Sequence, residues 1–218
     1  MNYIVIENAL PPDLLRAIGL AIQAGPFESG KHTAQGLAQA AKSNLQLATS
    51  PHASLLDSVA TAIQAHPVLQ AFALPRAMGR TLINRYEVGM EYGLHADGAY
   101  IQEVRTDVSF TLFLDDPASY QGGELVINTT AQTFSFKLAA GSMVLYPAGE
   151  LHRVTPVTQG VRHAVVGWLQ SRIRDAHQRE IIAKLSLVPR TLGKDPRYST
   201  LATQTGQCVQ DLIRMWGD

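Results

Sequence analysis

The sequence predicts a mainly β protein with flanking helices, in which the strands form a double-stranded β-helix, or jelly roll. Between about residues 80 and 170, segments such as 108–114 and 133–138 are rich in aromatic and β-branched residues. Turn sequences such as Asp115-Asp116-Pro117 and Gln121-Gly122-Gly123 separate them. Short strands at regular spacing are typical of a sandwich or jelly roll.

The region before this sheet is predicted to be helical after one strand at residues 1–6. Apolar residues recur near helical spacing over 11–24, where Pro11-Pro12-Asp13 provides a helix start, and again over 53–65. We expect both helices to pack on one sheet. Residues 25–47 are mixed and contain glycine, and we expect them to form a long loop across one end of the sheet.

The region after the sheet is predicted to be helical over 174–185 and 203–215, with an interruption by Pro and Gly between them. We therefore expect a jelly-roll domain at 1–172, with its catalytic core at about 78–172, and a C-terminal helical extension at 173–218. Arg172, Arg174 and Arg179 are expected to be solvated near a helix start.

Composition excludes several classes of protein. The 218 residues include 18 basic and 18 acidic side chains, so the charge footprint of a nucleic-acid-binding protein is absent. No apolar run approaches the roughly 20 residues of a membrane helix, and the first residues lack the basic region of a signal peptide. A single cysteine, Cys208, excludes an intramolecular disulfide and fits the cytoplasm.

Three residues have the spacing of a metal site. Alternate residues of a strand share a face, so His95 and Asp97 can bind one ion from one short stretch. His152 is the candidate third ligand, and a jelly roll can bring it to the same open end. Two imidazoles and one carboxylate leave about three positions of an octahedral Fe(II) ion open. Structural zinc sites, by contrast, usually have four protein ligands.

Arg162 is the candidate ligand for a carboxylate. It lies ten residues after His152, within reach of the same pocket if the two occupy neighbouring strands. The planar guanidinium can hold a carboxylate through two parallel hydrogen bonds.

The sequence resembles the prolyl/lysyl hydroxylase branch of the Fe(II)/2-oxoglutarate dioxygenases, and in particular bacterial PKHD-type hydroxylases. The likeness extends over nearly the whole chain. Ala96 replaces the usual Val between the two ligands, and residues 125–130 and 148–150 also depart from the pattern. The matching segments are 43–47, 83–86, 92–98, 105–109, 111–114, 122–125, 138–141, 144–147, 151–158, 168–171 and 212–216.

The resemblance implies a reaction and its cofactors. Fe(II) would be bound by His95, Asp97 and His152, and 2-oxoglutarate would chelate the iron while Arg162 binds its distal carboxylate. With dioxygen, the products would be succinate, CO2 and a hydroxylated substrate, and L-ascorbate (vitamin C) is the expected reductant.

Further residues are expected around this pocket. In the family the tyrosine at Tyr86 faces the co-substrate. Trp168, Thr111, Ser109 and Tyr92 are further candidates to line the pocket; core packing is the alternative for Trp168, and a structural role is the favoured interpretation for Ser109 and Thr111. Asp107 is expected to pair with Arg105 or Arg85 at the surface, where an ion pair contributes little.

Three functions are left open. The substrate is a prolyl or lysyl residue of a peptide or protein, or a small molecule such as an amino acid or metabolite, or the chain is a non-catalytic metal-binding jelly roll. Arg162 and the retained Asp97 favour catalysis, because a binding module needs no clamp for an oxo acid. We expect residues 95–105 and 25–47 to determine the substrate. An edge strand or the C-terminal helix is a candidate contact for a homodimer.

Overall fold

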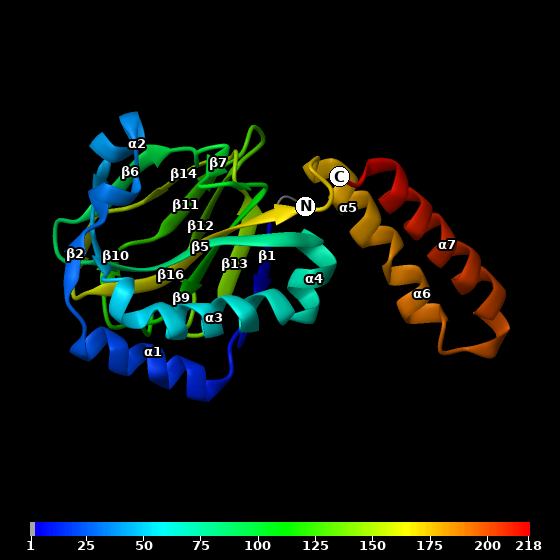
Figure 1. The fold of residues 1–218 in the computed structure, drawn as a ribbon, viewed down its shortest axis with the longest axis horizontal. Helices are drawn as coiled ribbons and strands as arrows, with labels where there is room; N and C mark the ends of the chain where they lie inside the picture. Colours follow the sequence, from blue (N-terminus) through cyan, green and yellow to red (C-terminus); the bar gives the residue numbers. More distant parts are fainter. Residues whose placement is uncertain (1–2) are drawn as a thin grey trace.

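The computed structural model describes residues 3–218 and contains two antiparallel sheets that face each other (Figure 1). This arrangement confirms the predicted jelly roll. The predicted first strand is present over Ile4–Ile6, whereas Met1 and Asn2 lie outside the described residues. The larger sheet has the order β1 (Ile4–Ile6), β13 (Met143–Pro147), β9 (Val108–Phe113), β16 (Arg162–Ser171), β5 (Pro75–Tyr86), β4 (Leu45–Leu47) and β2 (Phe27–Ser29).

The smaller sheet carries the two predicted histidine ligands. Its strand β14 alternates exposed and buried residues, as expected for a strand with one face toward the interior. The order is β12 (Thr133–Phe136), β11 (Leu125–Asn128), β14 (Leu151–Val154), β6 (Glu91–His95) and β3 (Lys42–Ser43). Two short ribbons pair β7 (Tyr100–Ile101) with β8 (Val104–Arg105) and β10 (Gln121–Gly122) with β15 (Val157–Gln159).

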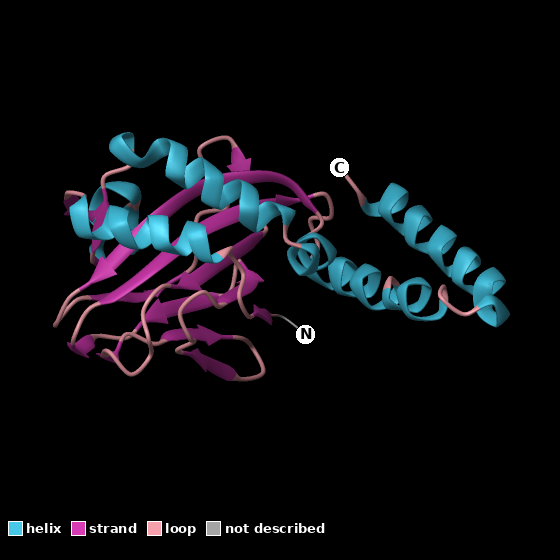
Figure 2. Ribbon diagram, turned by 90° about the horizontal axis from the view of Figure 1, so that it is seen from below, coloured by secondary structure: helices cyan, strands magenta, loops and turns pink. Residues whose placement is uncertain are grey.

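Three helices cover the outer face of the larger sheet (Figures 1 and 2). They are α1 (Pro12–Ala24), α3 (Ala53–Ala65) and α4 (Pro67–Ala73). Ile18 of α1 and Val59 of α3 are fully buried in one cluster with Leu112 of β9. The first two helices agree with their predicted ranges. The sequence did not predict α4, because its seven residues are too few for a clear periodicity.

The expectation of a long loop at 25–47 was wrong. This segment contains β2, the 3-10 helix η1 (Gly30–Thr33), the short helix α2 (Gly36–Ala40), β3 and β4. The strands β2 and β4 extend the larger sheet, while β3 extends the smaller one. Each strand has only two or three residues and forms by pairing with an existing sheet edge, so local periodicity carries no signal for it.

The C-terminal helices project away from the two sheets (Figure 1). They are α5 (Ala176–Leu185), α6 (Leu187–Leu192) and α7 (Ser199–Trp216), with a 3-10 turn η3 (Pro196–Tyr198) before the last. Ile173, Ile182 and Val209 form a separate small core there. Among residues 3–218, no helix combines the length and apolar character needed to cross a lipid bilayer.

Two expectations about arginines held only in part: Arg172 and Arg174 are exposed, and Arg105 pairs with Asp107. Arg179 is buried and donates hydrogen bonds to the carbonyl oxygens of Ile173 (2.8 Å) and Arg174 (2.7 Å), instead of being solvated. Arg105 and Asp107 do pair, but their side chains are only 10% and 5% exposed. Arg105 also reaches Asp218, and Arg179 approaches the carbonyl oxygen of Asp107, so the burial depends on contacts between distant segments that a local sequence pattern does not reveal.

Candidate metal centre

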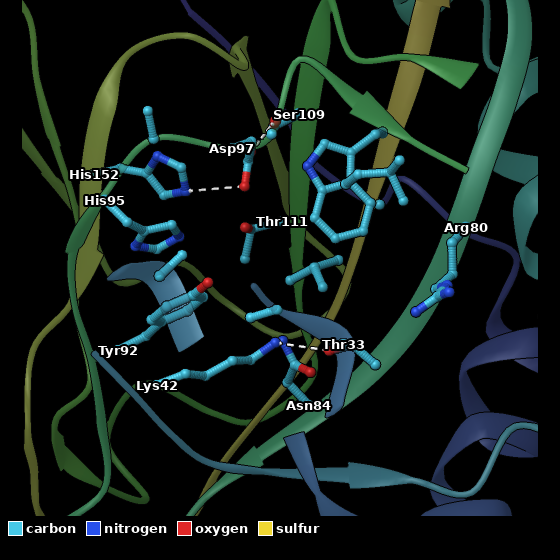
Figure 3. A pocket seen from close by; sticks show the side chains of 18 of the residues that line it. Thr33, Lys42, Arg80, Asn84, Tyr92, His95, Asp97, Ser109, Thr111 and His152 are labelled. Carbon is cyan, nitrogen blue, oxygen red and sulfur yellow. Dashed lines mark hydrogen bonds and ion pairs between the residues drawn. The ribbon is translucent and has the colours of Figure 1, made fainter. Parts of the chain in front are cut away.

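The three predicted metal ligands meet at one end of the smaller sheet (Figure 3). His95 at the end of β6 and His152 in β14 are register partners on adjacent antiparallel strands. Asp97 follows two residues after His95, and its Oδ1 lies 3.8 Å from His152 Nε2. One potential ligand atom from each residue lies within 4.8 Å of the other two. The strand pairing therefore brings together ligands that are 55 residues apart in the chain.

Backbone hydrogen bonds orient both imidazoles. His95 Nδ1 lies 2.7 Å from the carbonyl oxygen of Gly93, and His152 Nδ1 lies 2.9 Å from that of Glu150. A carbonyl oxygen can only accept, so each Nδ1 must carry the hydrogen and each Nε2 keeps its lone pair. Burial, followed by repulsion from His152, holds the pKa of His95 well below its usual value. A neutral imidazole with a free Nε2 is the form that binds a metal.

Neighbouring side chains restrict the movement of the three ligands. The Tyr92 ring stacks on His95 with a centroid distance of 3.6 Å, and Tyr146 contacts His152 edge-on at 5.1 Å. Ser109 Oγ donates a 2.6 Å hydrogen bond to Asp97 Oδ2, which leaves Oδ1 on the side of His152. Such supporting contacts hold ligands in a geometry suited to a metal.

A cavity of about 690 Å³ opens in front of these ligands. This volume is within the range of roughly 300–1,000 Å³ that is usual for small-molecule sites. Its wall includes all four residues expected to line the pocket, Ser109, Thr111, Tyr92 and Trp168, together with Tyr86. The hydroxyls of Ser109 and Thr111 reach this wall because β9 alternates them with residues of the main core.

Arg162 is buried beside the cavity. It begins β16 opposite Tyr86 in the register and is 1% exposed. Its guanidinium lies 5.2 Å from the Tyr86 ring and 5.3 Å from the Phe113 ring, and Nε and Nη2 have no hydrogen-bond partner among the described residues. Burial raises the pKa of the Tyr86 phenol to about 12, against an opposing effect of Arg162. Arg162 is not itself on the cavity wall, whereas Tyr86, its register partner, is.

A close approach at Gly123 makes room for Arg162. Gly123 has a φ of +68°, and a Cβ at this position would lie 2.9 Å from Arg162 Cδ. Only glycine combines this backbone conformation with the missing side chain. The Gly122-Gly123 pair, noted in the sequence as a turn, thus also accommodates the buried arginine.

Several cavity residues escaped the sequence analysis. Parts of the segments 25–47 and 95–105, which we expect to determine the substrate, line the cavity. Within them, however, Lys42 was not singled out, nor was Arg80 of β5. Lys42 directly precedes the matching segment 43–47, and this was the only available signal.

Comparison with known proteins agrees with this geometry. The profile of the 2OG-Fe(II) oxygenase superfamily matches residues 81–170. A PKHD-type hydroxylase of Hyphomonas neptunium is 43% identical over 99% of both chains, and one of Picosynechococcus sp. is 40% identical over 98% of both. The crystal structure of a prolyl-4-hydroxylase from Pseudomonas putida has a TM-score of 0.53 at 20% identity, covering 78% of this chain and 93% of that one. The chain belongs to the PKHD-type hydroxylases and is a 2-oxoglutarate-dependent oxygenase.

Proposed function

We propose that this member of the PKHD-type hydroxylases hydroxylates an unactivated C–H bond, with His95, Asp97 and His152 as the ligands of Fe(II). The observation that carries the proposal is the triad itself. Its two imidazoles have their Nε2 atoms free, and its carboxylate has one oxygen held by Ser109. Two nitrogen ligands and one oxygen ligand with open positions suit Fe(II) in oxygenases and differ from a closed structural zinc site.

We propose Arg162 as the residue that binds the distal carboxylate of 2-oxoglutarate, with Tyr86 beside it. The unpartnered Nε and Nη2 support this role, because buried N–H groups without hydrogen bonds are costly and a bidentate carboxylate would satisfy both. Tyr86 lies on the wall between the cavity and Arg162. A dicarboxylate of the right length would then bridge the metal ligands and the arginine.

The chain itself binds, orients and shields the reactants. When bound, Fe(II) and 2-oxoglutarate supply the oxidising power for hydroxylation, with succinate and CO2 as the products. The low exposure of His95 and His152 limits access of water to the site. Ser109, Tyr92 and Tyr146 hold the ligands in position. Trp168 and Thr111 form the wall against which the substrate would lie.

For the substrate, we propose a prolyl or lysyl residue of a peptide or protein, with an amino acid or small metabolite as the alternative. The likeness of the fold to a prolyl-4-hydroxylase supports the first, and the cavity is also large enough for the second. We further propose L-ascorbate as the reductant, a cytoplasmic location in view of the single cysteine, and a domain boundary near residue 172, where β16 ends.

Succinate release tests this function. Purified protein with Fe(II) should convert 2-oxoglutarate to succinate slowly without substrate, and faster with the correct peptide or metabolite, whose mass should increase by one oxygen. His152→Ala should abolish both reactions. His177→Ala is the matched control, since His177 is exposed and lies in α5, outside the cavity wall. Absence of 2-oxoglutarate binding and turnover in the wild type would contradict the proposal.

A further inference from the structure

We propose that Lys42 and Arg80 form a second anion-binding subsite in the cavity, which holds an oxyanion of the substrate to be hydroxylated. For an amino acid or a peptide, this oxyanion is a carboxylate. The inference rests on the proposed function and concerns the same cavity. The inference limits the substrates whose C–H bond is hydroxylated to molecules that carry a negative charge.

Lys42 is a buried cation without a buried counter-ion. It is 5% exposed, and its Nζ donates a 2.9 Å hydrogen bond to Thr33 Oγ1 and lies 5.1 Å from the centroid of the Tyr92 ring (Figure 3). Within residues 3–218, no carboxylate forms an ion pair with it. Lysines are almost never this buried unless they are paired. The ammonium therefore lacks one partner that its surroundings would normally provide.

The neighbouring side chains fix Lys42 in this position. The Thr33 hydroxyl has its hydrogen directed to Gly30 O (2.9 Å) or Gln46 Oε1 (3.0 Å), so its lone pairs face Lys42. Gln46 Nε2 in turn donates to Asn84 Oδ1 at 2.8 Å. This chain of hydrogen bonds spans three strands of two sheets and connects to Asn84 on the cavity wall. A binding group held by such a network loses little freedom when a ligand arrives.

Arg80 contributes a second positive charge. It is half-buried on β5, lines the same cavity, and forms no side-chain hydrogen bond or ion pair within the described part of the chain. It is close enough to Lys42 to disfavour the charged lysine: the pKa of Lys42 is lowered to about 8, mainly by burial, and Arg80 adds to this effect while Asp97 opposes it. Two like charges that face one cavity without counter-ions form a site for an anion.

The charges of the proposed complex leave this pair uncompensated. Among the described residues, the cavity wall includes two basic side chains, Lys42 and Arg80, and one acidic side chain, Asp97. In the proposed complex Fe(II) is bound to Asp97, and 2-oxoglutarate is bound between the metal and Arg162. The positive charges of Fe(II) and Arg162 then balance the negative charges of Asp97 and 2-oxoglutarate. Lys42 and Arg80 then remain, so a substrate that supplies a further anion would neutralise part of this excess.

Binding of small probes tests the subsite. The protein is loaded with Ni(II), which blocks turnover, and saturated with 2-oxoglutarate; acetate and its neutral analogue acetamide are then titrated by calorimetry. We expect acetate to bind about tenfold more weakly to Lys42→Met and to Arg80→Met, the loss typical of one charge-assisted contact. Lys31→Met is the matched control, because Lys31 is exposed in the same segment and outside the wall. Equal acetate affinity in all four proteins, or equal binding of acetamide, would overturn the proposal.

The same variants distinguish the sources of the anion. If Lys42→Met and Arg80→Met each lower the affinity for 2-oxoglutarate tenfold, the two residues bind the co-substrate and the proposal is wrong. If 2-oxoglutarate binding is unchanged, glycine and N-acetylglycine are compared as competitors of acetate. Glycine represents a free amino acid, and N-acetylglycine resembles a peptide C-terminus, so the better competitor identifies the substrate type. If neither competes with acetate, the proposed subsite is contradicted. Loss of 2-oxoglutarate binding in the wild type would instead count against the proposed function.

Discussion

Two buried arginines, Arg162 and Arg105, differ in how their charges are satisfied. Arg162 begins β16 and has two nitrogen atoms without a partner. Arg105 lies near the other end of β16, where its Nη2 donates to the carbonyl oxygen of Ser171 at 3.0 Å. It also binds both carboxylate oxygens of Asp107 and reaches Asp218 at 2.7 Å. A buried cation saturated by its own chain stabilises the fold, whereas an unsaturated one retains its capacity for a ligand.

The network of Arg105 supports the metal site indirectly. Asp107 Oδ2 accepts a 2.8 Å hydrogen bond from the Ser171 backbone N–H, which joins the end of β16 to the start of β9. The intervening Thr106 donates its hydroxyl to Gly98 O, one residue after Asp97. Asp218 therefore connects the C-terminal helices to the segment that carries a metal ligand. Arg105 thus acts on the candidate site by position, whereas Arg162 is proposed to act by binding.

The largest expected effect is on stability, through Arg105. Arg105→Met leaves Asp107 buried beside the end of β16 without its main counter-ion, so we expect the free energy of unfolding to fall by about 3 kcal/mol. Urea denaturation measures this change, with the exposed Arg190→Met as the control. A loss below the scatter of the control would mean that the network does not stabilise the fold.

Arg162→Met should give the opposite pattern. The affinity for 2-oxoglutarate should fall about 100-fold, as expected when a charged bidentate hydrogen bond is lost. Stability without ligand should be unchanged or higher, because a buried charge with unsatisfied nitrogens is removed. Calorimetry with the Ni(II)-loaded protein and urea denaturation measure the two quantities. A large loss of stability without loss of affinity would reverse the roles assigned to the two arginines.

Lys42 is a buried cation with one neutral hydrogen-bond partner, Thr33, and its ionisation should make stability depend on pH. The folded-state pKa of about 8 is below the usual lysine value of 10.5, so between these pH values the unfolded chain binds more protons than the folded chain. Stability should therefore rise with pH from about 8 to 10, by about 1–2 kcal/mol at pH 9.5. Urea denaturation at pH 8 and 9.5 would detect it. The same rise in Lys42→Met would assign the effect to another group.

The smallest effect is expected at an exposed ion pair. Arg197 and Asp195 approach to 2.6 Å on the surface near η3, with side chains 79% and 32% exposed. Solvent screens such a pair and its contribution is small. Asp195→Asn should leave the urea midpoint unchanged within error, although the two oxygens accept the same kind of hydrogen bonds as those of Asp107. A clear shift of the urea midpoint would show that the number of hydrogen bonds to the carboxylate, and not its burial, determines its contribution to stability.

Much of the fold and the metal site follows from local spacing. The helix at 53–65 was predicted with its observed bounds, because four apolar residues recur on one face. His95 and Asp97 were predicted as a pair because alternation along a strand is a local property. The fragmented segment 25–47 was not predicted, because β3 and β4 form by pairing with the distant strands β6 and β5, and β2 then pairs with β4. For the same reason the sequence offered no role for Lys42.

Residue types and their spacing were therefore sufficient to identify a jelly roll, three candidate metal ligands and an arginine suited to a carboxylate. Only the folded chain showed which buried cations are already satisfied. Arg105 binds Asp107, the carbonyl oxygen of Ser171 and Asp218, which is 113 positions away, whereas Arg162 and Lys42 have no carboxylate partner among the described residues. This difference depends on contacts between distant segments, and the energy of a buried charge depends on all of its partners together. Alternation and helical periodicity describe neighbours along the chain, so they contain no information about such partners.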